Sequence, residues 1–271
     1  MKIKFLGTAA AEGIPALSCG CETCKRAKKL GGRNLRSRSQ ALINNDLLID
    51  FNADTYWHMV KYDIELENIN HVLITHSHQD HLQVKDIEYF RPDFCHGRKE
   101  SINFYSAISG YNLIKQEADM PYMQGSVKYH LVEPYNDYLI NGYKIKVLKA
   151  NHAEFTTPVF YLIEKDNKKL LYAHDTGIFC QDTINYIGGR VDFITMDCTG
   201  GLQKGWRDNH LCLETNLEMI EILKSRKIVD NKTIKVVNHF SHNGQALYDD
   251  IVKELKGTDI ICSYDGLEIE F

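Results

Sequence analysis

Short apolar runs recur along the whole chain, and most of them alternate with polar residues or end at glycine, asparagine or aspartate. Runs of this length that are rich in valine, isoleucine and aromatic residues are typical of β-strands. The pattern predicts strands at Lys2–Gly7, Gln40–Asn44, Asp46–Phe51, His71–His76, Ser101–Tyr105, Val127–Val132, Tyr143–Leu148, Val159–Ile163, Lys169–Ala173, Asp192–Met196, Thr233–Val237 and Ile260–Ser263.

Apolar residues at helical spacing separate several of these runs. The predicted helices are Ala53–Lys61, Leu82–Tyr89, Ala107–Gln116, Leu213–Ser225 and Ala246–Leu255. Turn residues at Asn141-Gly142 and Asp166-Asn167 predict two hairpins. This mixture predicts two mostly antiparallel or mixed sheets that face each other, with helices outside. The segment Thr8–Ser39 is long for a connection, so we expect it to be functional or held in place.

Composition indicates an ordinary globular protein. The chain has 271 residues, of which 44% are hydrophobic and 25% charged, and we expect residues 1–271 to form one domain. A net charge of −4 gives no general attraction to nucleic acids or anionic membranes. The exception is Lys25–Arg38, which is basic and has no acid; a solvated loop and a phosphate-facing loop are equally good interpretations.

No apolar run approaches the roughly 20 residues of a membrane helix, and Met1–Leu6 has the pattern of a strand rather than of a secretory signal. We therefore expect a cytoplasmic protein with no membrane partner. In that compartment the eight cysteines are expected to be thiols or metal ligands rather than disulfides. A homodimer is a reasonable expectation for such a protein.

The segment after the apolar run Val72–Ile74 carries the strongest chemical signal. It reads Thr-His-Ser-His-Gln-Asp-His and places His76, His78, Asp80 and His81 within six positions. Neutral imidazole and carboxylate groups suit zinc, manganese or iron. In an extended chain the first two histidines point to the same side and can share one ion. We expect the chain then to turn into a helix, with the last two residues facing a second ion.

Further ligands are expected just after later strands, because loops at strand ends commonly carry chemistry. His152 follows the strand at 143–148, Asp175 follows the strand at 169–173, and His239 follows the strand at 233–237. Taken alone, a histidine after a strand is usually a surface or core residue; the anchoring motif changes that interpretation.

In this order these residues resemble the metallo-β-lactamase superfamily, over nearly the whole chain. The resemblance implies an α/β fold, a four-layer αβ/βα sandwich of two mixed sheets flanked by helices, with metals at one edge. It implies that His76, His78 and His152 hold one ion, that Asp80, His81 and His239 hold a second, and that Asp175 bridges them. Antibiotic-hydrolysing members generally lack a bridging carboxylate, so that activity is not expected.

Three cysteines in six residues, Cys19, Cys21 and Cys24, form a second signal. Their spacing is typical of a zinc knuckle, and His242, three residues after His239, is the expected fourth ligand of a structural zinc. A redox cysteine pair is the main competing interpretation. The cysteine loop together with His239-x-x-His242 resembles the cyclic phosphodiesterase branch of the superfamily, typified by a phosphoribosyl cyclic phosphodiesterase.

The phosphodiesterase and tRNA-processing branches place a histidine just before a helix, near the scissile phosphate, and His210 occupies that position here. The resemblance implies that it protonates the leaving oxygen or holds a phosphate oxygen, with Asp197 as a residue that could orient it. Helix capping or a plain surface position would also explain a histidine there. The expected catalytic residues are His210, Asp80 and Asp175.

The expected function is hydrolysis of a small cyclic phosphodiester by a hydroxide that bridges two divalent ions, with zinc, manganese and iron as the candidate metals. Nucleic acid is a possible but less favoured substrate, because the chain lacks the Gly- and Pro-rich basic arm of RNA 3′-processing nucleases. Two further functions compete with this expectation on the same fold: a thioesterase-like enzyme, and a non-enzymatic cofactor-biosynthesis or binding protein.

Overall fold

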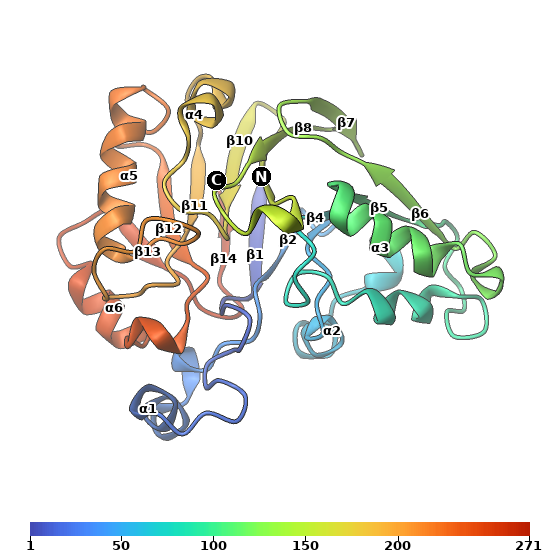
Figure 1. Cartoon of the computed structure of the whole chain (residues 1–271), viewed down its shortest axis with the longest axis horizontal. Helices are drawn as coiled ribbons and strands as arrows, with labels where there is room; N and C mark the ends of the chain where they lie inside the picture. Colours follow the sequence, from blue (N-terminus) through green and yellow to red (C-terminus); the bar gives the residue numbers. More distant parts are fainter.

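A computed structural model describes all residues, 1–271. Its centre is a pair of seven-stranded sheets that face each other (Figure 1). The strand order is β14-β1-β2-β3-β4-β5-β6 in the first sheet and β13-β12-β11-β10-β9-β8-β7 in the second. Both sheets are mixed, with antiparallel pairs toward one side and three consecutive parallel pairs toward the other.

The strands of the first sheet are β1 (Lys2–Gly7), β2 (Gln40–Ile43), β3 (Leu47–Ile49), β4 (His71–Ile74), β5 (Ile102–Ser106), β6 (Val127–Leu131) and β14 (Glu268–Glu270). Those of the second sheet are β7 (Asp137–Ile140), β8 (Tyr143–Lys149), β9 (Val159–Lys165), β10 (Lys168–Ala173), β11 (Phe193–Asp197), β12 (Ile234–Asn238) and β13 (Ile260–Cys262).

The α-helices are α1 (Glu22–Leu30), α2 (Thr55–Tyr62), α3 (Ile108–Ala118), α4 (Gln181–Ile187), α5 (Leu213–Ser225) and α6 (Tyr248–Glu254). Short 3₁₀ segments are η1 (Gly32–Asn34), η2 (Leu66–Asn68), η3 (Val84–Phe90), η4 (Pro121–Met123), η5 (Glu154–Thr156) and η6 (His242–Gly244). None of these helices is long and apolar enough to cross a membrane.

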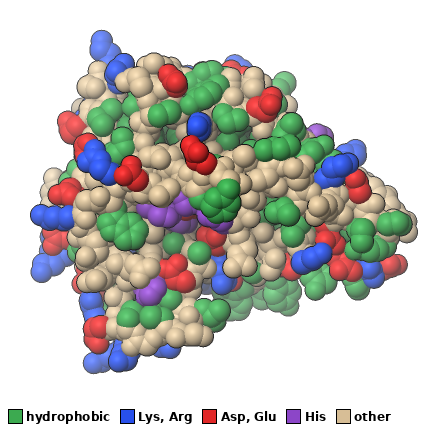
Figure 2. Space-filling view, in the orientation of Figure 1, with side chains coloured by type: hydrophobic (Ala, Val, Ile, Leu, Met, Phe, Trp, Pro, Cys, Tyr) green, Lys and Arg blue, Asp and Glu red, His purple; other side chains and the backbone are tan.

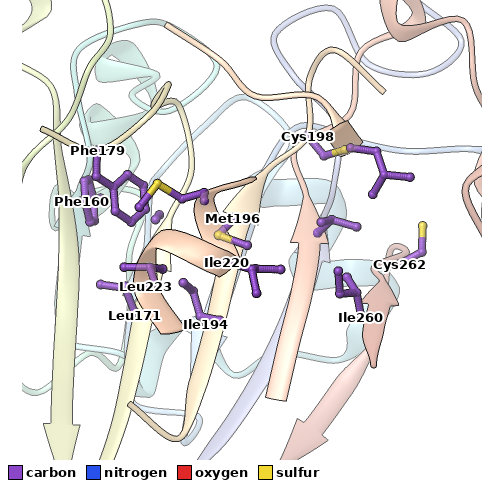
Figure 3. Packing of buried hydrophobic residues seen from close by; sticks show 14 of the residues in the cluster. Phe160, Leu171, Phe179, Ile194, Met196, Cys198, Ile220, Leu223, Ile260 and Cys262 are labelled. Carbon is purple, nitrogen blue, oxygen red and sulfur yellow. The ribbon is translucent and has the colours of Figure 1, made fainter. Parts of the chain in front are cut away.

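Three apolar clusters define the layers. One lies between the sheets and joins Phe5 and Leu73 of the first sheet to Tyr161 and Phe193 of the second. A second packs the outer face of the second sheet against α4, α5 and α6, as Figure 3 shows for part of it. The third covers the outer face of the first sheet with α3 and η3. The predicted αβ/βα sandwich of two mixed sheets is therefore confirmed.

Both predicted hairpins are present. In the hairpin of β7 and β8, the pair nearest the turn is Ile140 with Tyr143, and in that of β9 and β10 it is Lys165 with Lys168. All four turn residues have positive φ, between 50° and 76°, the backbone that tight hairpin turns require and that asparagine, aspartate and glycine tolerate.

Predictions from the local sequence pattern were wrong or incomplete in some places. The helix predicted at Leu82–Tyr89 is the 3₁₀ segment η3, so the chain does not enter an α-helix directly after His81. Helices α1 and α4 were not predicted, and neither was the terminal strand β14. Both helices are short, with nine and seven residues, and helices of this length are stabilised by tertiary contacts rather than by propensity.

Candidate metal centres and active site

Strand ends from both sheets place the predicted ligands at one edge of the sandwich. His76 lies two residues after β4, and His152 lies three residues after β8. Asp175 follows β10, and His239 directly follows β12. Histidine side chains gather in the middle of the face shown in Figure 2. Residues far apart in sequence meet here because these strand ends lie at the same edge of the sandwich.

The first cluster consists of His76, His78 and His152. Nδ1 of His78 lies 2.8 Å from Nε2 of His76 and 3.3 Å from Nε2 of His152. His76 and His152 are buried, whereas His78 is partly exposed. Three imidazole nitrogens converge on one point and leave an open side, which is the arrangement of a catalytic metal site.

The second cluster consists of Asp80, His81, Asp175 and His239, all of them buried. Oδ2 of Asp175 lies 2.6 Å from Nε2 of His81 and 2.9 Å from Nε2 of His239. The other oxygen, Oδ1, lies 3.8 Å from Nε2 of His152, in the first cluster. One carboxylate therefore faces both clusters through different oxygens, which is the geometry of a bridging ligand.

Besides the residue types, a second observation indicates that these residues fit divalent ions. Nε2 of His81, Oδ2 of Asp175 and Nε2 of His239 are buried, and although the oxygen lies close to both nitrogens, none of the three atoms makes a hydrogen bond of normal geometry. Buried polar atoms are normally satisfied, so such a group of three needs an explanation. A cation would satisfy all of them at once, because each offers a lone pair directed to the same place.

The four residues predicted to hold a structural zinc also meet. Nδ1 of His242 lies 3.6 Å from Sγ of Cys19 and 3.4 Å from Sγ of Cys21. Cys24 completes the group and is fully buried, accepting a hydrogen bond from the backbone of Ala16 at 3.2 Å. Three sulfurs and one imidazole within mutual reach are a normal tetrahedral zinc set.

The hydrogen bond with His242 is the main reason why the pKa of the Cys21 thiol falls to about 6. A thiol with such a pKa is largely thiolate at neutral pH, which is the form that binds zinc. The opposite nitrogen of His242, Nε2, lies 3.5 Å from Glu12. A carboxylate on that side fixes the orientation of the ring.

The family model for the "Beta-lactamase superfamily domain" matches residues 47–231, more than half of the chain. The chain belongs to this superfamily. The predicted resemblance to the metallo-β-lactamase superfamily is thus confirmed, and the superfamily is one of metal-dependent hydrolases.

Several solved structures share the fold of this superfamily member over its whole length. The zinc-bound PqqB from Methylobacterium extorquens has 19% identity, full coverage of both chains and a TM-score of 0.79. A diphosphatase of the PhnP family has 20% identity, covers 100% of this chain and 98% of its own, and has a TM-score of 0.76. The short form of human tRNase Z has 15% identity, coverage of 100% and 99%, and a TM-score of 0.66. No curated protein matches the chain in sequence.

Asp50 and Thr199 support the second cluster and were not predicted from the sequence. Nδ1 of His81 donates to Asp50 at 2.7 Å, and Nδ1 of His239 lies 2.8 Å from Oγ1 of Thr199. Such contacts fix the ring so that Nε2 points to an ion. The only signal for Asp50 was an acid directly after the apolar run Leu47–Ile49, a pattern that many surface turns share.

Asp50, Asp175 and His239 have positive φ values of 67°, 49° and 60°. Residues other than glycine rarely adopt this backbone conformation, and it costs about 1 kcal/mol or more per residue. The surrounding hydrogen bonds hold it in place: Asp50 accepts from the backbone and hydroxyl of Thr75, at 2.8 and 2.9 Å. The fold thus keeps these side chains directed at the cluster although their backbone conformation is locally unfavourable.

Protons and cations compete for the second cluster. Burial disfavours a charged His239, but the carboxylates of Asp175 and Asp197 outweigh burial and raise the pKa of His239 to about 10. Burial lowers the pKa of His76 well below its usual value, and the neighbouring His81 adds to this effect. Metal binding at the second cluster must therefore release protons, whereas His76 is ready as a neutral ligand.

His210 lies at the rim of both clusters. Its Nδ1 is 3.0 Å from Oδ2 of Asp197 and 3.6 Å from Oδ1 of Asp175, and its ring is 4.9 Å from that of His152. The predicted contact with Asp197 is therefore present. Burial opposes protonation, but the two carboxylates raise the pKa of His210 above its usual value. Its side chain keeps 22% of its exposure, so a bound molecule can reach it.

Arg26, Arg33, Arg36 and Arg38 of the basic segment are engaged within the chain. Arg26 forms an ion pair with Asp250 at 2.9 Å, and Arg38 forms one with Asp54 at the same distance. The Arg36 guanidinium is buried over the ring of Phe240, and that of Arg33 lies over the ring of Tyr264. Lys25, Lys28 and Lys29 remain exposed on α1. Most of this segment is an anchor rather than a surface for phosphate.

Proposed function

We propose that this superfamily member is a metal-dependent phosphodiesterase that acts on a small cyclic phosphodiester. The observation that carries the proposal is the pair of clusters that share Asp175, with His210 beside both of them. Two divalent ions, when bound, would lower the pKa of a water molecule and offset charge on a phosphoryl group. The remaining steps fall to side chains of the chain itself.

His210 is the proposed general acid. Asp197 accepts from Nδ1 of His210 and stabilises its protonated form, so that Nε2 can donate a proton to the departing alcohol. Asp197 also accepts hydrogen bonds from the backbone of Thr199 and Leu211, at 2.9 and 3.0 Å. These bonds hold the carboxylate of Asp197 in place, and its proposed role is to position His210.

A small substrate is favoured over RNA by the charges available near the site. Most of the predicted basic segment is tied to acids and aromatic rings of the same chain, and the net charge is −4. Binding to a polyanion normally requires free basic side chains. The proteins that share this fold include a diphosphatase and a tRNase Z, so a phosphorus ester is the substrate class that we propose.

The experiment measures both the metal content of the protein and its turnover of phosphodiesters. Protein loaded with zinc or manganese is tested on bis-(p-nitrophenyl) phosphate and on a 1,2-cyclic ribose phosphate. The variant His210→Ala should retain its metal and lose about 10²- to 10⁴-fold in kcat. Under this proposal about three ions are bound per chain, two in the shared clusters and one in the cysteine cluster.

His130→Ala is the matched control, because His130 lies on β6 among Tyr105 and Asn103 and contacts neither cluster. It should leave turnover unchanged. One tightly held zinc per chain and no turnover with added metal would overturn the proposal, and would favour a zinc-stabilised binding or cofactor-assembly protein on the same fold.

A further inference from the structure

Phe155 is exposed beside a residue of the first cluster. Its side chain is 81% exposed, although it lies only three residues after His152. Its ring centroid is 5.7 Å from that of His78, with an angle of 64° between the planes. A hydrophobic surface also borders the histidines in Figure 2. An exposed aromatic ring therefore adjoins the partly exposed His78 of the first cluster.

The segment that carries Phe155 is firmly anchored. Ser109, at the start of α3, donates through its backbone to the hydroxyl of Thr157 at 3.1 Å and through its own hydroxyl to the carbonyl of Thr156. Thr156 is buried and its hydroxyl donates to the carbonyl of Ala153 at 2.7 Å. The turn η5 is thus closed on itself and fastened to another element, and Phe155 cannot easily fold down onto apolar surface.

Single exposed apolar residues are common and by themselves need no explanation. Phe155 differs from Leu139, which is similarly exposed at 77% on strand β7, because its ring borders the candidate metal site and its backbone is fixed. A fixed aromatic face next to a phosphate-binding site is suited to stacking on a planar ring of the substrate, and such stacking needs little rearrangement of the protein.

We propose that Phe155 determines specificity by stacking on a planar base attached to the sugar of the cyclic phosphodiester, so that 2′,3′-cyclic nucleotides are preferred over base-free cyclic sugar phosphates. This inference rests on the proposed phosphodiesterase function. In such a nucleotide only one sugar ring separates the base from the phosphate. The ring of Phe155 lies close enough to His78 for a base to reach it while the phosphate of the same nucleotide lies at the first cluster.

The test uses two substrates with the same cyclic phosphate. They are adenosine 2′,3′-cyclic phosphate and 1-O-methyl-ribose 2,3-cyclic phosphate, in which a methyl group replaces the base. The ratio of their kcat/KM values is compared between the natural chain, Phe155→Leu and Phe155→Tyr. Phe155→Leu should lower the ratio roughly 5- to 100-fold, the range expected for one lost stacked base. Phe155→Tyr keeps an aromatic face and should preserve the ratio.

Binding gives a readout that does not depend on turnover. Calorimetry compares adenosine monophosphate with ribose 5-phosphate on the metal-loaded protein, and the preference for the base should fall in Phe155→Leu by a similar factor. Leu139→Ala serves as the control for loss of an exposed apolar residue and should change neither ratio.

The two proposals fail in different ways. If Phe155→Leu leaves both ratios unchanged while the base-free diester is hydrolysed, Phe155 does not stack on substrate and the phosphodiesterase function stands. If no diester is hydrolysed by the metal-loaded natural chain, the proposed function fails. Equal loss on both substrates in Phe155→Leu would also overturn stacking, because it would show that Phe155 only shields His78.

Discussion

The two candidate metal centres are built in opposite ways. The clusters that share Asp175 draw their ligands from segments that follow β4, β8, β10 and β12, in both sheets, and most of these ligands are buried. The cysteine cluster takes three of its four ligands from Cys19–Cys24, in a connection between strands, and Cys21 is exposed. The first depends on the whole fold, and the second on one loop and His242.

This difference separates two roles of a metal ion. At the shared clusters the scaffold already aims the side chains, through Asp50 and Asp197, so bound ions would add chemistry to a preformed site. At the cysteine cluster an ion would tie the loop that carries Cys19, Cys21 and Cys24 to His242, in addition to contacts such as the ion pair of Arg26 with Asp250. The two centres are linked through Phe240, which lies between His239 and His242 in the sequence. Its backbone forms hydrogen bonds with the backbone of Thr8 and Ala10. Substitutions in each centre should therefore have different consequences.

Asp175→Ala should have the largest effect, because it removes the carboxylate that faces both clusters. We expect loss of both ions there and a fall in diester hydrolysis of about 1,000-fold or more. The zinc of the cysteine cluster should remain. Metal analysis per chain and hydrolysis assays measure the two effects. Asp182→Ala, at an exposed acid on α4, is the control, and a variant that kept both ions would show that Asp175 is no bridge.

Asp50→Asn should weaken metal binding without removing a ligand. Asp50 orients His81 through the bond to Nδ1, and loss of such a partner typically costs about 10- to 100-fold in metal affinity. Titration with a chelator measures this affinity, while the zinc of the cysteine cluster serves as an internal reference. An unchanged affinity would mean that the scaffold does not preorganise the second cluster.

Cys24→Ser should lower stability more than chemistry. Cys24 is buried, and the substitution would remove one ligand of an ion that stabilises the folded chain when it is bound. We expect Tm to fall by roughly 5–10 °C, with both ions of the shared clusters retained. Calorimetry and metal analysis give the two readouts, and Cys180→Ser, at an exposed cysteine outside the cluster, is the control. If Cys24→Ser lost the ions of the shared clusters and kept its Tm, the cysteine cluster would support the chemistry rather than the stability of the protein.

His58→Gln should alter the acid stability of the junction between the loop and α2. Burial lowers the pKa of His58 to about 4, with Asp54 opposing and Lys61 adding to the shift. Because the unfolded value is about 6.5, the neutral ring stabilises the fold fully above that pH, and this stability is lost as pH falls toward 4.

The expected size of this effect is up to about 3 kcal/mol of unfolding free energy between pH 7 and pH 4, absent in the variant. Urea unfolding of both proteins across this range measures it. His58 bonds to Ser37 and Gln40 at 2.7 and 2.6 Å, and glutamine keeps a polar group there. Parallel pH dependence in the two proteins would show that His58 does not carry the acid sensitivity.

Strand patterns predicted the fold well because both sheets are buried on their faces, which requires apolar runs in sequence. Bounds were accurate for β1 and α5, which match the predicted Lys2–Gly7 and Leu213–Ser225. The prediction of an α-helix at 82–89 was wrong because the apolar spacing there suits both an α-helix and the 3₁₀ segment η3. Packing against α3 and the chain path out of His81, rather than local spacing, decide between them.

The sequence by itself determined the ligand types, their order along the chain and the alternation that builds two sheets. Their meeting at one edge was predicted only through the family resemblance. Tertiary structure alone decided that the two oxygens of Asp175 face different clusters, that Asp50 holds His81, that the arginines of the basic segment are engaged within the chain, and that Phe155 is held open beside His78. The physical reason is that these contacts join residues tens to hundreds of positions apart, and local propensity carries no record of such distances.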